Sequence, residues 1–406
     1  MSRVADTVAK SLSRRHFIAG SAAALVLAGA GPAFARSVSS FVDGLWTEAK
    51  ARGVPKKVFD AAMGGFEPIP SVIELANKQP EFLWTAADYI NKRVNDKQVG
   101  TGRDMAGEWK KTLAKVEGRW GVQSEAVLAI WGIETNYGSF MGGNNTVHAL
   151  ATLVYEGYRA DYFRGELLTA LQVLAQGHVT ADKMVGSWAG AMGHPQFMPT
   201  SFMKYAVDFK GDGKKDIWTS VPDAQASTAN YLKEFGWRAG ETWGYEISLP
   251  RGFNYMNVWA GVEASIGDWA DAGLTRISGK AFPRRGDMAK VFMPMGGIGP
   301  VFLTLENFGV IKRYNNSDSY ALAVGHLADR IRGGGAIVAT WPDDTALKKD
   351  GRIELQKALL RKGYDIGSAD GVLGPKTRGA IMDWQGKKGL LADGHAGGNL
   401  LKALQA

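Results

Sequence analysis

Apolar side chains recur at helical spacing through most of the chain. In the first such region, Phe41, Leu45 and Ala49 follow one another every four positions, with Trp46 beside them. Residues three or four apart share one face of an α-helix, so this pattern predicts amphipathic helices. The predicted helical regions are 36–63, a segment starting after Pro80, 104–119, 124–137, about 145–156, 160–175, 223–235 and 316–331, while the proline-broken stretch 64–72 is predicted to be a loop.

The pattern changes over residues 240–295. The stretches "WGYEISLP", "NVWAGV" and "KVFMPM" are short, aromatic or β-branched, and separated by Gly and Pro. Such runs are typical of strands, and they predict a small strand-bearing insertion in a mainly α (α+β) protein. Residues 332–345, "RGGGAIVATWPDDT", are predicted to be a linker. The periodic segment 346–406 then forms a further domain, in which Asp370-Gly371 recurs as Asp393-Gly394.

An acid interrupts the most apolar of the predicted helices. In "AVLAIWGIETNYG", residues 126–138, Glu134 shares one helix face with Val127, Ile130 and Trp131. Burial and the negative end of the helix dipole both disfavour the charged carboxylate, so we expect a raised pKa for Glu134. A protonated Glu is the general acid that glycoside cleavage requires. The alternative is a structural Glu that binds a backbone amide or an arginine.

Small residues around Glu134 favour the catalytic interpretation. Gly132, Thr135, Asn136 and Gly138 leave space for a bulky group to approach the acid. A structural Glu has no need of that clearance.

Two further stretches are typical of a saccharide groove. "GSWAGAMGHPQFMPTSF", residues 186–202, is a poor helix and a poor strand. Its aromatic and methionine side chains suit sugar rings, and its polar side chains suit hydroxyls or acetamides. The alternative is a buried, tightly packed loop. In 307–324, polar-tipped aromatics and an amide cluster before a helix, and the alternative there is a loop with an Asn cap.

The N-terminus and the composition indicate an exported protein. "SRRHFIAGSAAALVLAGAGPAFA" places Arg14 and Arg15 before an apolar run that ends in a small-x-small site, which resembles a twin-arginine export signal over residues 1–35. An uncleaved membrane anchor is the alternative. The chain has no cysteine, which excludes disulfides and lipidation on cysteine. We therefore expect a periplasmic protein without a lipid anchor.

The charge distribution favours an acidic wall polymer as partner. The formal net charge is +8, and the last 59 residues hold 11 basic and 6 acidic side chains. A basic terminal domain on an exported protein is better suited to a carboxylate-bearing wall polymer than to nucleic acid.

Together, these stretches resemble the B family of lytic murein transglycosylases. "GIETNYG", "GSWAGAMGHPQFMPTSFMKYAVDFKGDGKKDIW" and "FLTLENFGVIKRYNNSDSYALAV" occur in the family's order over about 40–330, and the last 59 residues resemble a peptidoglycan-binding module. The resemblance implies a lysozyme-like catalytic domain over 36–331, and a small three-helix peptidoglycan-binding domain over 346–406. It implies that Glu134 is the catalytic acid and base. It assigns saccharide binding to Ser187, Met192, Gln196, Phe197, Tyr231, Tyr314, Asn315 and Tyr320.

The family cleaves the MurNAc-GlcNAc β-1,4 bond without water and leaves a 1,6-anhydro end. One carboxylate suffices for this, because the substrate supplies both nucleophiles. Two alternatives stay open from the sequence. A hydrolytic muramidase needs a second carboxylate, for which Glu156, Asp161 and Glu166 are candidates. A non-catalytic wall-binding protein needs none.

The resemblance implies glycan strands as partners and leaves stem peptides open as a second ligand, and we expect a monomer without a cofactor. The loop "DFKGDGKKDIW" has calcium-loop spacing at Asp208, Asp212 and Asp216, but Lys210 stands where a ligand belongs. A solvated turn is therefore predicted there rather than a calcium site. The histidines are too scattered to predict a zinc site.

Overall fold

A computed structural model describes residues 37–78 and 84–406. The predicted export signal over 1–35 lies outside the described residues. The described chain divides into two compact units, one made of 84–133 and 232–406 and the other of 37–78 and 134–231. The chain passes between the units inside two helices, α8 (Ser124–Thr135) and α12 (Val221–Glu234). Glu134 is the first residue of the second unit on that side of the division.

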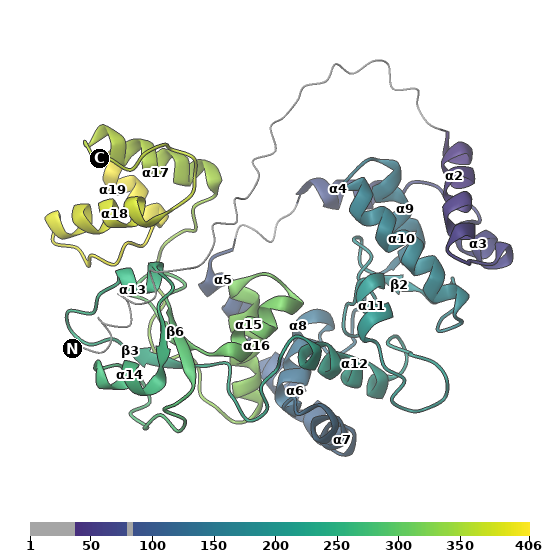
Figure 1. Ribbon diagram of the computed structural model, residues 1–406, viewed down its shortest axis with the longest axis horizontal. Helices are drawn as coiled ribbons and strands as arrows, with labels where there is room; N and C mark the ends of the chain where they lie inside the picture. Colours follow the sequence, from purple (N-terminus) through teal and green to yellow (C-terminus); the bar gives the residue numbers. More distant parts are fainter. Residues whose placement is uncertain (1–36, 79–83) are drawn as a thin grey trace. The chain divides into compact units, whose positions relative to one another are not determined.

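The unit that contains Glu134 is helical around a central pair. Helix α10 packs along α9 and α11, and Figure 1 shows α9 and α10 side by side. A two-residue strand pair, β1 with β2, is the sheet of this unit. The elements are α2 (Val38–Ala51), α3 (Lys56–Met63), α4 (Pro70–Lys78), β1 (Asn144–Asn145), α9 (Thr146–Tyr155), α10 (Ala160–Ala175), β2 (Val185–Gly186) and α11 (Pro199–Tyr205).

Some boundaries differ from the prediction for physical reasons. The region 36–63 forms two helices rather than one, because Pro55 caps the start of α3 in an extended conformation. Helix α4 begins at Pro70, inside the stretch predicted to be a loop, since proline is well tolerated in the first turn of a helix. Helix α8 ends at Thr135, two residues before the predicted end, where the backbone turns left-handed.

The helices of the other unit surround α16, which contacts α5, α6 and α15. The predicted helix 104–119 is divided between α6 and α7 at Trp109, which caps the end of one and the start of the other. The helices of this group are α5 (Ala86–Arg93), α6 (Asp96–Glu108), α7 (Lys110–Trp120), α15 (Glu306–Tyr314) and α16 (Asp318–Ile331).

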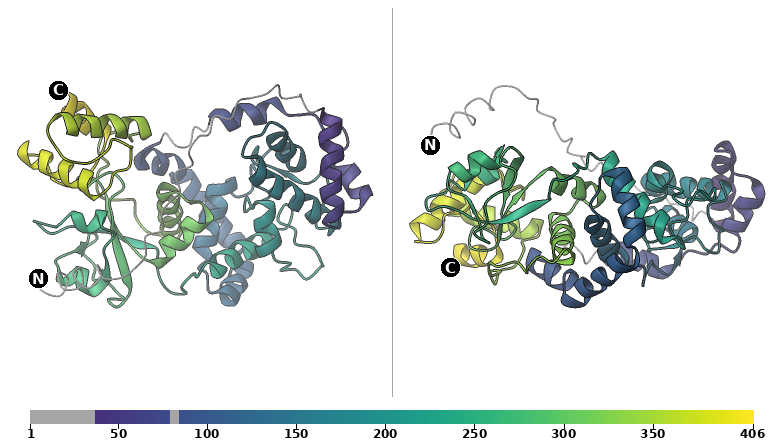
Figure 2. Two further views of the ribbon diagram at one scale, coloured as in Figure 1. Left: turned by 45° about the horizontal axis from the view of Figure 1, so that its top comes forward. Right: turned by 90° about the horizontal axis from the view of Figure 1, so that it is seen from below.

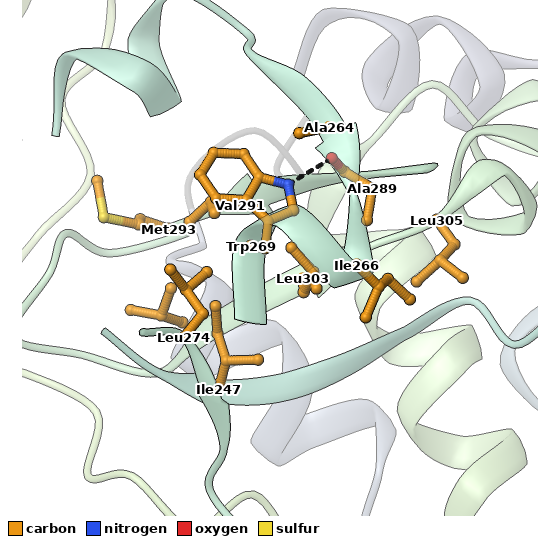
Figure 3. Packing of buried hydrophobic residues seen from close by; sticks show 11 residues of the cluster. Ile247, Ala264, Ile266, Trp269, Leu274, Ala289, Val291, Met293, Leu303 and Leu305 are labelled. Carbon is orange, nitrogen blue, oxygen red and sulfur yellow. Dashed lines mark hydrogen bonds between the residues drawn. The ribbon is translucent and has the colours of Figure 1, made fainter. Parts of the chain in front are cut away.

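The predicted strand-bearing insertion is a five-stranded antiparallel sheet in the order β4-β6-β7-β3-β5. Its last strand in sequence, β7, lies beyond the predicted limit of residue 295. Trp269 packs at the centre of the sheet's core and donates its indole N–H to the Ala289 carbonyl at 2.9 Å (Figure 3). The elements are β3 (Gly244–Ser248), α13 (Met256–Trp259), β4 (Glu263–Ser265), α14 (Ile266–Asp271), β5 (Thr275–Arg276), β6 (Met288–Phe292) and β7 (Val301–Thr304).

The C-terminal segment forms three helices around one apolar core, α17 (Lys349–Arg361), α18 (Pro375–Lys387) and α19 (Gly398–Gln405). Figure 2 shows them grouped together from two sides. The two Asp-Gly pairs have the same hydrogen bonding. The amide of Gln356 joins Asp370 and Gly371, and that of Gln385 joins Asp393 and Gly394. The repeat is therefore a turn stabilised by a buried glutamine, used twice.

This three-helix module packs against the sheet within one unit. The indole N–H of Trp259 donates to the Asp393 carbonyl at 2.7 Å, and the Gly297 N–H donates to the Asp393 carboxylate at 2.8 Å. The segment predicted to be a linker is also anchored, because Glu246 on β3 accepts hydrogen bonds from the N–H groups of Val338 and Ala339.

No helix in the described ranges has both the length and the apolar composition that crossing a membrane requires.

A buried carboxylate organises the loop between α11 and α12. The Asp223 side chain has no accessible surface and accepts hydrogen bonds from the N–H groups of Phe209, Lys210 and Asp216. These bonds hold 208–216 against the start of α12.

We expect Asp223→Asn to lower the free energy of unfolding by about 1–3 kcal/mol, because the amide turns two donors toward N–H groups that need an acceptor. Chemical denaturation measures the change. Asp212→Asn removes the same charge from an exposed position in the same loop and serves as the control. Equal stability of the two variants would contradict the role given to Asp223.

Candidate functional site

Glu134 lies on the last turn of α8, directly before a sharp reversal of the chain. Asn136, Tyr137 and Gly138 all have left-handed backbone conformations, with φ of 49°, 57° and 82°. Such conformations are costly for residues other than glycine and cluster at functional sites. Glu134 itself is partly buried. The reversal therefore ends the helix just beyond the acid and keeps its side chain at the edge of the core.

A short hydrogen-bond network maintains the reversal. The Thr135 hydroxyl accepts from the Gly138 N–H at 3.1 Å and donates to the His194 carbonyl at 3.2 Å. A Cβ on Gly138 would lie 2.3 Å from the His194 ring, so no larger residue fits there without movement. Burial raises the pKa of Tyr137 and lowers that of His194. The loop after Glu134 is thus packed directly on the segment 193–197.

The predicted groove segment 186–202 is a tight double turn. Met192 pairs with both Gly186 and Phe197 through backbone bridges, and α11 begins at Pro199. The Ser187 hydroxyl accepts the Ala191 N–H at 3.1 Å. Gln196, with φ of 50°, donates its amide to the carbonyls of Met141 and Gly193. This side chain therefore ties the turn to the loop that follows Glu134.

The apolar residues predicted for the groove are mostly buried. Met192 and Phe197 are buried, and so is Tyr231, whose ring centre lies 5.6 Å from that of Phe197. Tyr205 packs edge-on against Tyr231 at 4.8 Å. The structure thus brings five of the predicted saccharide residues into the unit that contains Glu134, namely Ser187, Met192, Gln196, Phe197 and Tyr231. Their contact with substrate stays a prediction.

The other three predicted residues lie around the junction of α15 and α16, in the other unit. Tyr314 is the last residue of α15, Asn315 follows it in an extended, exposed conformation, and the Ser317 hydroxyl caps α16. Tyr320 is 1% exposed and belongs to the core under this loop. The helix cap is therefore Ser317 rather than the asparagine of the alternative interpretation, and Asn315 stays accessible.

The carboxylates of the calcium-like loop are bound to the chain itself. Asp208 accepts from the N–H groups of Gly211, Asp212 and Gly213, and Asp216 accepts from those of Trp218 and Thr219. Side chains arranged in this way are committed to the turn. Among residues 37–78 and 84–406, no three His, Cys, Asp or Glu side chains gather as a metal site would require.

The pKa of Asp329 is also raised, and the sequence did not indicate this residue. Asp329 on α16 lines a cavity of about 590 Å³ and accepts the Trp243 indole N–H at 2.8 Å. Burial raises the pKa of Asp329 to about 6, although 35% of its side chain is accessible, and burial lowers the pKa of His326 to about 4. The sequence pattern around Asp329 is the same as the one that indicated Glu134, namely an acid within an apolar helix. That pattern alone therefore does not locate a catalytic group.

Comparisons with known proteins identify the families of the two domains. The transglycosylase SLT domain family matches residues 37–329, and the putative peptidoglycan binding domain family matches 348–404. Membrane-bound lytic murein transglycosylase B of Escherichia coli is 35% identical over 249 residues, which span 60% of this chain and 66% of that protein.

Solved structures extend the likeness over more of the chain. SltB3 of Pseudomonas aeruginosa, solved with NAG-anhNAM-pentapeptide, is 44% identical with a TM-score of 0.85, and the match covers 91% of this chain and all of that one. Soluble SltB1 of the same organism is 30% identical with a TM-score of 0.63, over 72% of this chain and 97% of that one.

These matches define a peptidoglycan-directed lytic transglycosylase fold with an added wall-binding module. The chain belongs to the transglycosylase SLT domain family and is homologous to the lytic murein transglycosylases of the B type.

Proposed function

We propose that this protein cleaves the MurNAc-GlcNAc β-1,4 bond of peptidoglycan without water and leaves a 1,6-anhydroMurNAc end. The observation that carries the proposal is the position of Glu134, on the last turn of an apolar helix and directly before a strained reversal. The ligand named for SltB3, NAG-anhNAM-pentapeptide, contains the anhydro sugar that such a reaction produces.

Glu134 acts twice in the proposed reaction. The protonated carboxyl donates its proton to the glycosidic oxygen as the bond to C1 of MurNAc breaks. The N-acetyl carbonyl of the same sugar then stabilises the electron-poor C1. The Glu134 carboxylate next takes the proton of the C6 hydroxyl, whose oxygen bonds to C1 and closes the anhydro ring. The proton count balances, and Glu134 ends protonated.

The hydrolytic alternative needs a second carboxylate, and one of its three candidates is committed elsewhere. Glu166 is buried, and its two oxygens accept from the Thr200 N–H at 2.9 Å and the Thr200 hydroxyl at 2.7 Å. It stabilises the start of α11 and is not available to activate water. Glu156 and Asp161 are exposed at helix ends.

The proposed setting is the periplasm, reached through the twin-arginine signal, with glycan strands and stem peptides as partners. The protein would act there as a monomer without cofactor or lipid anchor. The absence of cysteine and the basic three-helix module support this part of the proposal.

Mass spectrometry of the products from purified sacculi tests the reaction. We expect muropeptides that end in 1,6-anhydroMurNAc, which are lighter than the reducing products by one water. Because borohydride reduces only free reducing ends, these products should also resist it. Reducible MurNAc ends would instead establish a muramidase, and intact sacculi would establish a binding protein.

A further inference from the structure

A large cavity lies where the C-terminal module meets the rest of its unit. Its volume is about 800 Å³, and its lining comes from four places, one of which is residues 84–86 at the start of α5. Trp259 belongs to the sheet region, and Asn316 and Ser319 belong to the loop after Tyr314 and Asn315. Arg352, Leu373 and Arg378 belong to the module. The module and the loop that carries the predicted saccharide residues therefore share one cavity.

Two arginines, Arg352 and Arg378, line this cavity and give it positive charge. Arg378 stacks on Trp259, with its guanidinium carbon 3.8 Å from the ring centre, and donates to the Gly394 carbonyl at 2.6 Å. The Nε atoms of Arg378 and Arg352 are both buried and have no hydrogen-bond partner in the described part of the chain. Buried donors of this kind normally have a partner, so each carries an unmet requirement for an acceptor.

The positive charge of the pair is only partly compensated, by the longer-range charge of Asp393 on Arg378. Within residues 37–78 and 84–406, neither arginine lies within ion-pair distance of a carboxylate. Burial lowers the pKa of Arg378 to about 10. The charge of Asp393 opposes this effect, and the smaller effect of the Arg352 charge adds to it. Two like charges in a partly dry cavity cost free energy that a bound anion recovers.

The acidic groups around the cavity are already engaged. Asp318 pairs with Lys312 at 2.6 Å. The Asp393 carboxylate accepts from the Gly297 N–H, the Gln385 amide and the His395 N–H. Asp344 lies 3.6 Å from His395, whose pKa is lowered, chiefly by burial. Asp393 therefore attracts Arg378 from beyond ion-pair distance, while its carboxylate oxygens already accept hydrogen bonds from other groups.

We propose that this cavity binds a carboxylate of a peptidoglycan stem peptide, with Arg352 and Arg378 as its anion-binding residues. The inference rests on the function proposed above. The planar fork of a guanidinium matches a carboxylate, while Trp259 and Leu373 offer apolar surface to the aliphatic part of a peptide. A site shared by the module and the 316–319 loop would hold the peptide of a strand whose sugars the same loop contacts.

Titration of the full chain with a soluble stem tetrapeptide tests the site. Calorimetry follows the binding. We expect Arg352→Gln to weaken binding about tenfold to a hundredfold, the loss typical of a charge-assisted hydrogen bond. Arg361→Gln removes the same charge from an exposed position on the same helix and is the matched control. The same tetrapeptide with all its carboxylates amidated should bind weakly to the wild type. Its affinity there should not exceed the affinity of the free-acid peptide for the Arg352→Gln variant.

A second pair of variants distinguishes loss of the binding site from misfolding. Leu373→Glu should place a tethered carboxylate in the cavity and abolish peptide binding without loss of thermal stability, because it neutralises the arginines. Val372→Glu adds the same charge at the neighbouring position, which is 66% exposed, and should leave binding within about twofold of the wild type. Equal peptide binding by Leu373→Glu and Val372→Glu, or by Arg352→Gln and Arg361→Gln, would overturn the proposal.

Activity separates this inference from the proposed function. Arg352→Gln should cleave peptide-free glycan strands at the wild-type rate and show a raised KM only on strands that carry peptides. If the wild type produced no anhydro ends yet bound the peptide through Arg352, the proposed reaction would be wrong. The proposed peptide site would then still be supported. If anhydro ends formed with the same KM for both strand types in wild type and variant, the cavity proposal would fail alone.

Discussion

Glu134→Gln is expected to reduce the turnover of sacculi by about a thousandfold or more, since the amide can neither give a proton to the leaving oxygen nor take one from the C6 hydroxyl. The fold should survive, because Gln has the size and the hydrogen-bonding capacity of a protonated Glu. Release of soluble muropeptides over time measures the activity, and circular dichroism and thermal unfolding measure the fold.

Glu125→Gln is the matched control for this substitution. Glu125 lies in the first turn of the same helix and pairs with Arg332 at 3.2 Å across a largely exposed surface. Loss of that pair should cost under about 1 kcal/mol and leave turnover unchanged. Activity of Glu134→Gln close to that of Glu125→Gln would remove Glu134 from the reaction.

Comparing the pH profiles of the wild type and of Glu134→Gln tests the predicted protonation state of Glu134. If Glu134 is the acid of the first step, activity should fall as pH rises through its pKa in the wild type. The residual activity of Glu134→Gln should lack that step. A pKa in the ordinary range for Glu, measured by NMR, would contradict the raised pKa that the sequence predicts.

Trp269→Ala should destabilise the sheet region by about 3–5 kcal/mol, the usual cost of truncating a large buried aromatic residue. Trp269 is 1% exposed and packs against Ile247, Val291 and Leu303 from three strands (Figure 3). Its loss also leaves the Ala289 carbonyl without the indole donor. Urea unfolding followed by circular dichroism gives the change.

Met288→Ala provides the comparison in the same sheet. Met288 lies on β6 and is 41% exposed, so its truncation should change stability by less than about 0.5 kcal/mol. A similar loss for the two variants would mean that Trp269 is not the centre of this core.

Several elements were predictable because their signals are local. The apolar period of residues 124–137 predicted α8, which ends two residues earlier at Thr135. The period of 160–175 predicted α10 with its observed bounds. The mainly helical fold, the strand-bearing insertion, the peptidoglycan-binding module and the family were all predicted from motifs and are confirmed. Each depends on residue patterns within a few tens of positions, which periodicity and motif spacing report directly.

Other features were missed because they depend on partners far away in the sequence. Strand β7 is an all-buried run between β6 and β3, and its apolar side chains look the same for a strand and a helix core. Met192 and Phe197 were expected to line a groove, yet both side chains are buried, and the Phe197 ring packs on Tyr231. The sequence shows that these residues are apolar but not which face of the loop they occupy.

The sequence by itself determined the helices, the position of the acid on its helix face and the kinship of the two domains, because these follow from spacing along one segment. Only the tertiary structure decided that the chain reverses through three left-handed residues after Glu134. It also decided that Arg352 and Arg378 share a cavity with the 316–319 loop and that Glu166 is committed to Thr200. Arg352 and Arg378 are 26 positions apart, and Glu166 and Thr200 are 34 positions apart. The free energy that selects such contacts is the burial and pairing of groups that no single segment contains.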